Sequence, residues 1–217
     1  MCCSFTLIIA PEALAKAFNL KEIPDIEPRY NISPSQSVIS IRHAGDHNKL
    51  DYLKWGLLPG RFEDVGNTPI IARSETVHEM TTFQHAIKYS RCIIPASGFF
   101  EWLPKDDFTQ PYYIRLNSSF VGFAGLWEKR KADDGTEIET CCILTTAANE
   151  VVKPINDRMP VILKPEDYNL WLDKSIYDSN ELQRLYKPYS SALMVAYKVP
   201  DLVNNPRFDS AACIVRV

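Results

Sequence analysis

Short segments rich in β-branched and aromatic residues, separated at frequent intervals by proline and glycine, constrain the fold of this chain more than any other feature. They predict strands at residues 38–41, 52–58, 92–94, 112–116, 120–124, 141–146, 159–163, 193–196 and 213–217. Helical periodicity is limited to residues 11–18, about 75–88, 165–172 and 180–186. Strands and helices do not alternate regularly, which argues against a doubly wound parallel sheet. We therefore expect one α+β domain over residues 1–217, built on a mainly antiparallel, partly closed β-barrel with peripheral helices.

Two local patterns refine this expectation. The most polar stretch, residues 129–140, predicts the tip of a hairpin, because Asp134-Gly135 can supply the turn. Pro165, followed by Glu166 and Asp167, predicts the start of a helix, since proline suits the first turn and carboxylates suit the positive end of a helix.

The composition is that of an ordinary globular protein. Of the 217 residues, 46% are hydrophobic and 24% are charged, which excludes a disordered or fibrous chain. The formal net charge of −3 excludes a uniformly basic surface but leaves room for a local basic groove. No apolar run approaches the ~20 residues of a membrane span, so we expect no membrane partner.

The number and spacing of the cysteines indicate the cellular compartment in which we expect the protein. Their spacing is too irregular for a disulfide framework, with residues at positions 2, 3, 92, 141, 142 and 213. No C-x-x-C or histidine-rich spacing indicates a zinc site, and no other ligand cluster is visible. We expect a reduced, cytoplasmic, monomeric protein that uses neither a metal nor a cofactor.

The first candidate for chemistry is Met1-Cys2. Methionine ahead of a small residue is commonly removed, and its removal leaves Cys2 with a free α-amine beside its thiol. The reference pKa values, about 7.7–8.0 and about 8.5, make both groups nucleophilic near neutral pH. Such an aminothiol can close a thiazolidine on an aldehyde, or it can act as an N-terminal nucleophile of the amidohydrolase type. A cysteine at position 2 can also be incidental.

The second candidate is Glu101, within the aromatic run Gly98-Phe99-Phe100-Glu101-Trp102. If buried there, its carboxyl needs a partner or a proton, and its pKa rises toward the range useful for general acid–base catalysis. The alternative is a glutamate on an edge strand that faces solvent.

Arg73 follows a short apolar strand, and its guanidinium suits a phosphate. An ion pair of Arg73 with Glu75 or Glu101 is the competing explanation. Two more polar clusters, at residues 29–31 and 156–160, fit either a site or turns with a charge partner.

Several motifs carry a resemblance to a known family. In chain order they are Met1-Cys2, RYNISP (29–34), KWGLLPG (54–60), IARSET (71–76), SGFFEW (97–102), LTTAAN (144–149), NDRMPVIL (156–163) and VNN (203–205). Their order and spacing resemble those of the SOS response-associated peptidase (SRAP) family of abasic-site processing proteins. The resemblance covers nearly the whole chain.

The resemblance implies that Met1 is lost and that Cys2 joins the ring-opened aldehyde of an abasic site in single-stranded DNA as a thiazolidine. In the cell this would place the protein on the nucleoid when DNA is damaged. By position, Glu101 matches the catalytic glutamate that moves protons. Arg73 and Arg158 match arginines that hold the DNA backbone. The same resemblance assigns the DNA-binding face to Trp55, Gly56, Pro59 and Gly60, and the lining of the site to Ile71, Glu75 and Asn31.

Three positions depart from the family pattern. Ser4 stands where arginine is usual, Ile71 where asparagine is usual, and Asn156 where histidine is usual. Asn156 cannot titrate, although an amide can still hold a hydroxyl or a water in a catalytic position. We expect slow but real crosslinking, with a slowed reversal, because the aminothiol is intrinsically reactive.

Two other functions stay open at this point. The departures also fit a catalytically degenerate relative that binds single-stranded DNA or a protein, and Cys2 also fits a thiol autopeptidase that removes Met1. For base stacking the candidates are Trp55, Phe62, Phe99 and Trp102. His78 or His85 could take the place of the missing histidine.

Overall fold

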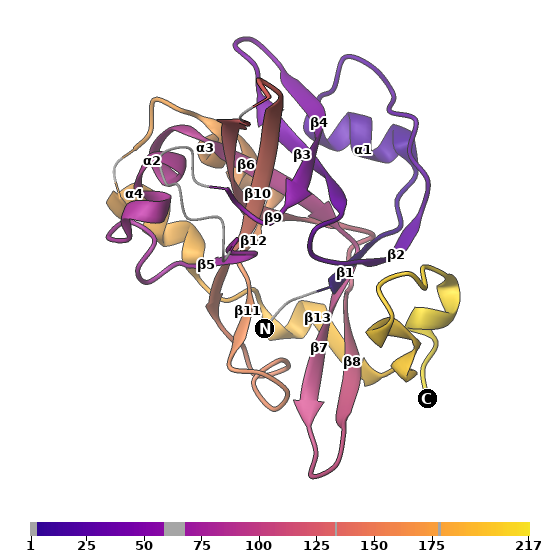
Figure 1. The fold of residues 1–217 in the computed structure, drawn as a ribbon. Coiled ribbons are helices and arrows are strands. Elements are labelled where there is room, and N and C mark those ends of the chain that lie inside the picture. The colour runs from indigo at the N-terminus through magenta and orange to yellow at the C-terminus, as the bar shows by residue number, and fades with distance from the viewer. Residues whose placement is uncertain (1–3, 59–67, 133, 178) are drawn as a thin grey trace.

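The computed structural model describes residues 4–58, 68–132, 134–177 and 179–217 (Figure 1). Five strands form a closed barrel, because β9 pairs both with β6 and with β10. In order around the barrel these strands are β10 (Glu137–Ala147), β4 (Asn48–Trp55), β3 (Ser37–His43), β6 (Arg91–Ala96) and β9 (Val121–Lys131). Most pairings are antiparallel, and the pairing of β10 with β4 is parallel. The expected barrel class is confirmed.

A second sheet of five antiparallel strands lies against the barrel (Figure 1). Its order is β13 (Met194–Lys198), β8 (Thr109–Leu116), β7 (Gly98–Pro104), β1 (Ser4–Leu7) and β2 (Arg29–Ile32). The two sheets share an aromatic core, in which the Phe5 ring lies 5.3 Å from Trp55 and 5.9 Å from Phe123, both edge-on. Edge-to-face aromatic packing stabilises such a core beyond the area it buries.

Three short strands extend the barrel wall. β5 (Ile71–Arg73) pairs in parallel with β10, and β11 (Arg158–Pro160) pairs with the end of β10 in antiparallel fashion. β12 (Ile162–Leu163) pairs with β9. Thr145 is the partner of both Arg73 and Pro160, so the end of β10 brings β5 and β11 together.

Helices lie at the periphery. They are α1 (Pro11–Phe18), α2 (Thr81–Tyr89), α3 (Tyr168–Leu172) and α4 (Ser179–Gln183), with 3-10 turns at Pro165–Asp167, Arg184–Tyr186, Ser191–Leu193, Asp201–Asn204 and Ala211–Ile214. Among the described residues, no helix is long and apolar enough to cross a membrane.

The expected helix over about residues 75–88 is wrong at its start. The chain makes turns after β5, in which the N–H of Thr76 bonds the Arg73 carbonyl and that of Met80 bonds the Thr76 carbonyl, so α2 begins only at Thr81. The expected strand at 213–217 is also wrong. The Ser210 hydroxyl accepts a hydrogen bond from the Ala212 N–H, a cap that favours the helical turn observed there.

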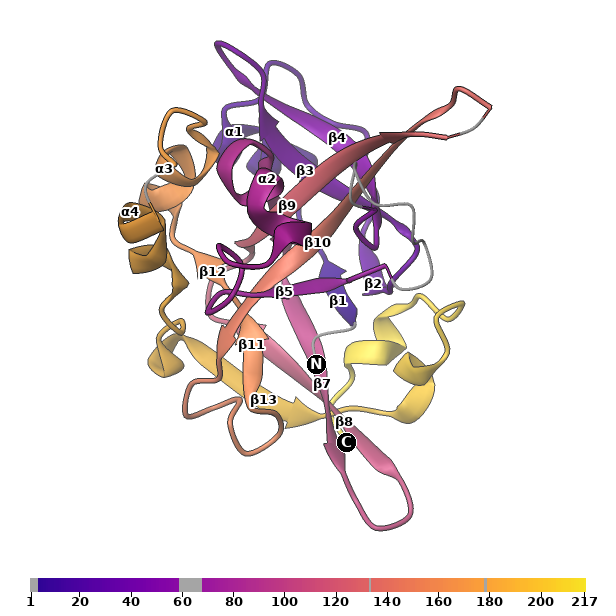
Figure 2. The same cartoon turned by 60° about the vertical axis from the view of Figure 1, so that its left-hand side comes forward.

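The hairpin expected at residues 129–140 is confirmed. It joins β9 to β10 and projects from the barrel (Figure 2). Gly135 has φ +86°, a conformation that glycine adopts without strain.

Candidate active site

Glu101 lies in β7 and is completely buried. Burial raises the pKa of its carboxyl to about 7, although a hydrogen bond from Asn156 lowers it. The charge of Asp157 also raises it. The buried alternative is therefore confirmed, and a solvent-facing glutamate is wrong. A carboxyl with this pKa is present in both protonation states near neutral pH, which general acid–base catalysis requires.

Asn156 contacts Glu101 directly. Its Nδ2 donates to Glu101 Oε2 over 2.9 Å, and its Oδ1 accepts from the backbone N–H of Arg158 over 3.1 Å. Because the carbonyl end of the amide faces a backbone N–H, the amino end points at the carboxyl. Asn156 therefore orients Glu101 but cannot exchange a proton with it.

Arg158, in β11, is a buried cation with a partner. Its guanidinium makes two hydrogen bonds to Glu75, of 2.7 and 2.9 Å, and a third to the Thr145 carbonyl of 2.7 Å. The Arg158 hydrogen bond lowers the pKa of Glu75. Glu75 occupies the guanidinium fork in this structure, and contact of Arg158 with a DNA backbone stays a prediction. The alternative of a charge partner is the observed one.

Arg73 ends β5 with an exposed side chain. It forms no ion pair with any residue that the structure describes, so the proposed pairs of Arg73 with Glu75 and Glu101 are wrong. Its charge does lower the pKa of Glu75, which places it near the Glu75–Arg158 pair. Ile71, at the other end of β5, is half-buried and pairs with Ile143. Arg73 stays available to an anionic ligand.

The aromatic candidates divide into core and surface. Trp55 is completely buried and donates from Nε1 to the Ile70 carbonyl over 2.8 Å, and Phe99 is completely buried beside Phe123. Base stacking by either ring is therefore wrong, since neither reaches solvent. Trp102 is half-buried and donates to Asn204 Oδ1 over 2.7 Å. Stacking by Trp102 stays a prediction.

The segment after Trp55 is only partly described. Gly56 has φ +136° and is buried, and a Cβ there would lie 3.2 Å from the Thr68 hydroxyl. Cys2, Pro59, Gly60 and Phe62 lie outside the described residues.

Neither histidine candidate lies at Glu101. His78 bonds the Tyr186 hydroxyl over 3.0 Å, and burial lowers the pKa of its ring. His85 bonds Glu128 over 2.9 Å. The suggestion that one of them takes the place of the family histidine is wrong.

Asn31 is completely buried and hydrogen-bonds several protein groups, including the Ser4 hydroxyl. Its expected place in the lining of the site stays a prediction. Sequence reasoning also missed Thr145, whose hydroxyl donates to the Ala72 carbonyl over 3.2 Å and accepts from Arg158 over 3.2 Å. The LTTAAN motif was the available signal for Thr145.

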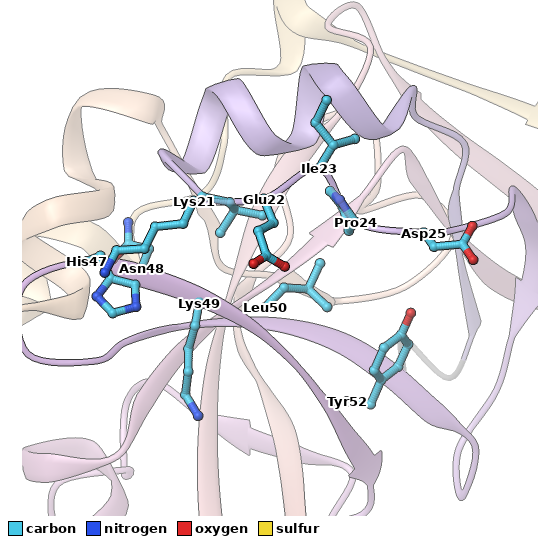
Figure 3. A pocket seen from close by; sticks show the side chains of 11 residues that line it. Lys21, Glu22, Ile23, Pro24, Asp25, His47, Asn48, Lys49, Leu50 and Tyr52 are labelled. Carbon is cyan, nitrogen blue, oxygen red and sulfur yellow. The ribbon is translucent and has the colours of Figure 1, made fainter.

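A cavity of about 570 Å³ lies elsewhere (Figure 3). Its walls are residues 20–25, between α1 and β2, and residues 47–50 and 52, at the start of β4. Lys21, Glu22, Leu50 and Tyr52 are among the side chains that surround it. None of the predicted site residues lines this cavity, so it does not mark the site.

Comparisons with known proteins agree on one family. The sequence profile described as SOS response associated peptidase (SRAP) matches residues 1–206. The chain is 41% identical over 221 residues to the abasic site processing protein YoqW of Bacillus subtilis, covering 99% of both chains. It is 32% identical over 160 residues to the abasic site processing protein YedK of Escherichia coli, covering 72% of this chain and 71% of that protein.

A crystal structure of a protein from Bacteroides thetaiotaomicron has the same fold, with a TM-score of 0.88 over the full length of both chains at 24% identity. A phage-related protein from Bordetella bronchiseptica gives a TM-score of 0.74 at 26% identity, over 91% of this chain and 94% of that one. The chain therefore belongs to the SOS response associated peptidase family.

Proposed function

We propose that this protein processes abasic sites in single-stranded DNA by joining Cys2, after removal of Met1, to the ring-opened sugar. The names of its relatives support the substrate class. The observation that carries the chemistry is Glu101, a buried carboxyl with its pKa raised to about 7.

The strand pairing supports a role for Cys2 beside this carboxyl. β1 begins at Ser4, which lies opposite Phe100, the residue before Glu101. Cys2 lies two positions before Ser4 in the sequence, and an extended chain covers about 7 Å over two residue steps. The chain length alone therefore keeps Cys2 within reach of Glu101.

The proposed reaction releases one water. The α-amine of Cys2 attacks the aldehyde carbon, and the resulting carbinolamine loses water to form an imine. The thiol sulfur then adds to the imine carbon, and the thiol proton ends on the nitrogen, which closes the thiazolidine. Glu101 accepts a proton from the attacking amine and donates one to the departing hydroxyl.

The amide of Asn156 lowers the rate that we expect for this reaction. General acid–base help contributes about 10²–10⁴-fold in rate, and an amide supplies none of it. Proton transfer then falls to Glu101, which Asn156 orients. We expect slow crosslinking and a slow reversal, so that the adduct persists.

A denaturing gel tests the proposal. The protein, with its mass first measured to establish the loss of Met1, is incubated with a single-stranded oligonucleotide that carries one abasic site. A band that survives denaturation is expected, absent with the intact oligonucleotide and with Cys2→Ala but retained with the neighbouring control Cys3→Ala. If the parent protein binds the oligonucleotide without an adduct while the aldehyde persists, the protein is a binding module. If the parent protein neither binds the oligonucleotide nor forms an adduct, the proposal fails.

A further inference from the structure

Asn31 has an unusual set of partners for a buried amide. Its Nδ2 donates to three carbonyls of one C-terminal loop, those of Val203 at 3.1 Å, Asn205 at 3.1 Å and Phe208 at 3.0 Å. The amide NH₂ group has two protons for three acceptors, so one proton is shared between two carbonyl oxygens. In Figure 1 and Figure 2 this C-terminal segment, drawn in yellow, lies beside β1 and β2.

The carbonyls fix which way the Asn31 amide points. A flipped amide would place Oδ1 against three carbonyl oxygens, and all of them are acceptors. Oδ1 therefore faces the two hydroxyls on its other side. Ser4 Oγ donates to it over 2.5 Å and Ser33 Oγ over 3.4 Å.

The loop is itself anchored to the same sheet. Asp209 accepts from the backbone N–H of Asn31 over 3.1 Å and forms an ion pair with Arg29. On the other side, Trp102 of β7 donates to Asn204. The loop that holds the Asn31 amide is therefore tied to both β2 and β7.

Ser4 lies between the strands that carry Asn31 and Glu101. It is the first residue of β1, it is buried, and it is the backbone partner of Phe100. In this chain serine stands where arginine was expected, and its hydroxyl points to Asn31. The side-chain contact thus fixes the end of β1 from which the chain continues toward Cys2.

We propose that Asn31 is a positioning residue for the reaction at Cys2: held by the carbonyls of residues 203–208, it accepts the Ser4 hydroxyl and so fixes the end of β1 beside Glu101. This inference rests on the proposed function. Positioning of reacting groups contributes strongly to rate, and small displacements are costly.

The test compares Ser4→Ala with Ser33→Ala. Each variant removes one hydroxyl that donates to Asn31 Oδ1, but only Ser4→Ala removes the hydrogen bond between Asn31 and β1. Single-turnover crosslinking is followed over a series of abasic oligonucleotide concentrations at 20 °C, and the melting temperature of each variant is measured. Ser4→Ala is expected to lower the maximal rate constant about 10-fold with an unchanged half-saturating DNA concentration, and Ser33→Ala to match the parent.

A purely structural role gives a different result. Ser4→Ala would then melt earlier, while the folded protein would crosslink at the parental rate, and this outcome overturns the inference. An equal loss of rate in Ser33→Ala also overturns it. If the parent protein forms no adduct, the proposed function fails instead, so the two failures are distinct.

Discussion

Replacement of Glu101 by glutamine is expected to make the protein more stable and less active. Its carboxyl is completely buried, and burial raises its pKa from the ordinary 4.5 to about 7. A raised pKa means that the folded state holds the proton more tightly than the unfolded chain does. Ionisation of Glu101 therefore opposes folding.

The sign and size follow from these two values. Below pH 4.5 the group is protonated in both states and has no effect on the pH dependence of stability. As the pH rises from 4.5 through 7, the unfolded chain loses the proton first, and stability falls. Above pH 8 the loss is complete, and a change of pKa from 4.5 to about 7 corresponds to about 3 kcal/mol.

Glutamine is neutral at every pH and keeps the shape of the side chain. Chemical denaturation of Glu101→Gln and of the parent, at pH 4.5 and pH 8, isolates the contribution of this one group. The difference in unfolding free energy between variant and parent should grow by about 3 kcal/mol in favour of the variant at pH 8. The exposed Glu79, replaced by glutamine, serves as the control and should show no such change. A difference that does not vary with pH, or that shrinks at pH 8, would refute the reasoning.

Three further predictions concern the surroundings of this carboxyl. Glu75→Ala leaves the buried Arg158 without its carboxylate and should lower the unfolding free energy by about 2 kcal/mol, as measured by denaturant titration. This loss is smaller than for a fully buried pair because half of the Glu75 side chain is exposed. Arg73→Gln should weaken binding to an intact single strand of DNA without changing the melting temperature of the protein. The slope of log affinity against log salt concentration should fall in magnitude by about one, as fluorescence anisotropy across a salt series will measure. Asn156→His should speed both crosslinking and its reversal, by about 10-fold or more, in single-turnover gels, and equal rates for parent and variant would contradict the role given to Asn156.

The fold class could be predicted because strand signals are local. Short β-type segments, the Asp134-Gly135 turn and the periodicity of residues 11–18 each depend on neighbouring residues, and the structure confirms all three. The start of α2 and the end of the chain were predicted wrongly. There, turn and capping hydrogen bonds decide between conformations that an apolar pattern does not distinguish.

Sequence patterns singled out individual residues of the candidate site, but they did not predict the contacts of these residues. The aromatic setting of Glu101 left open a buried carboxyl or one that faces solvent on an edge strand, and the structure shows the buried one. The pairing of Arg158 with Glu75, 83 residues apart, depends on how β5 and β11 meet at β10. The contact of Asn31 with Val203 spans 172 residues. Partners at such separations are set by packing of the whole chain, and no local pattern identifies them.

The central claim is that Cys2 captures an abasic site through its amine and its thiol together. The most direct measurement is the intact mass of the adduct with an abasic oligonucleotide, followed by fragmentation of its N-terminal peptide. The account predicts the mass of the protein without Met1 plus that of the oligonucleotide minus one water, with the added mass on Cys2. Retention of Met1, or an adduct on another residue, would contradict it.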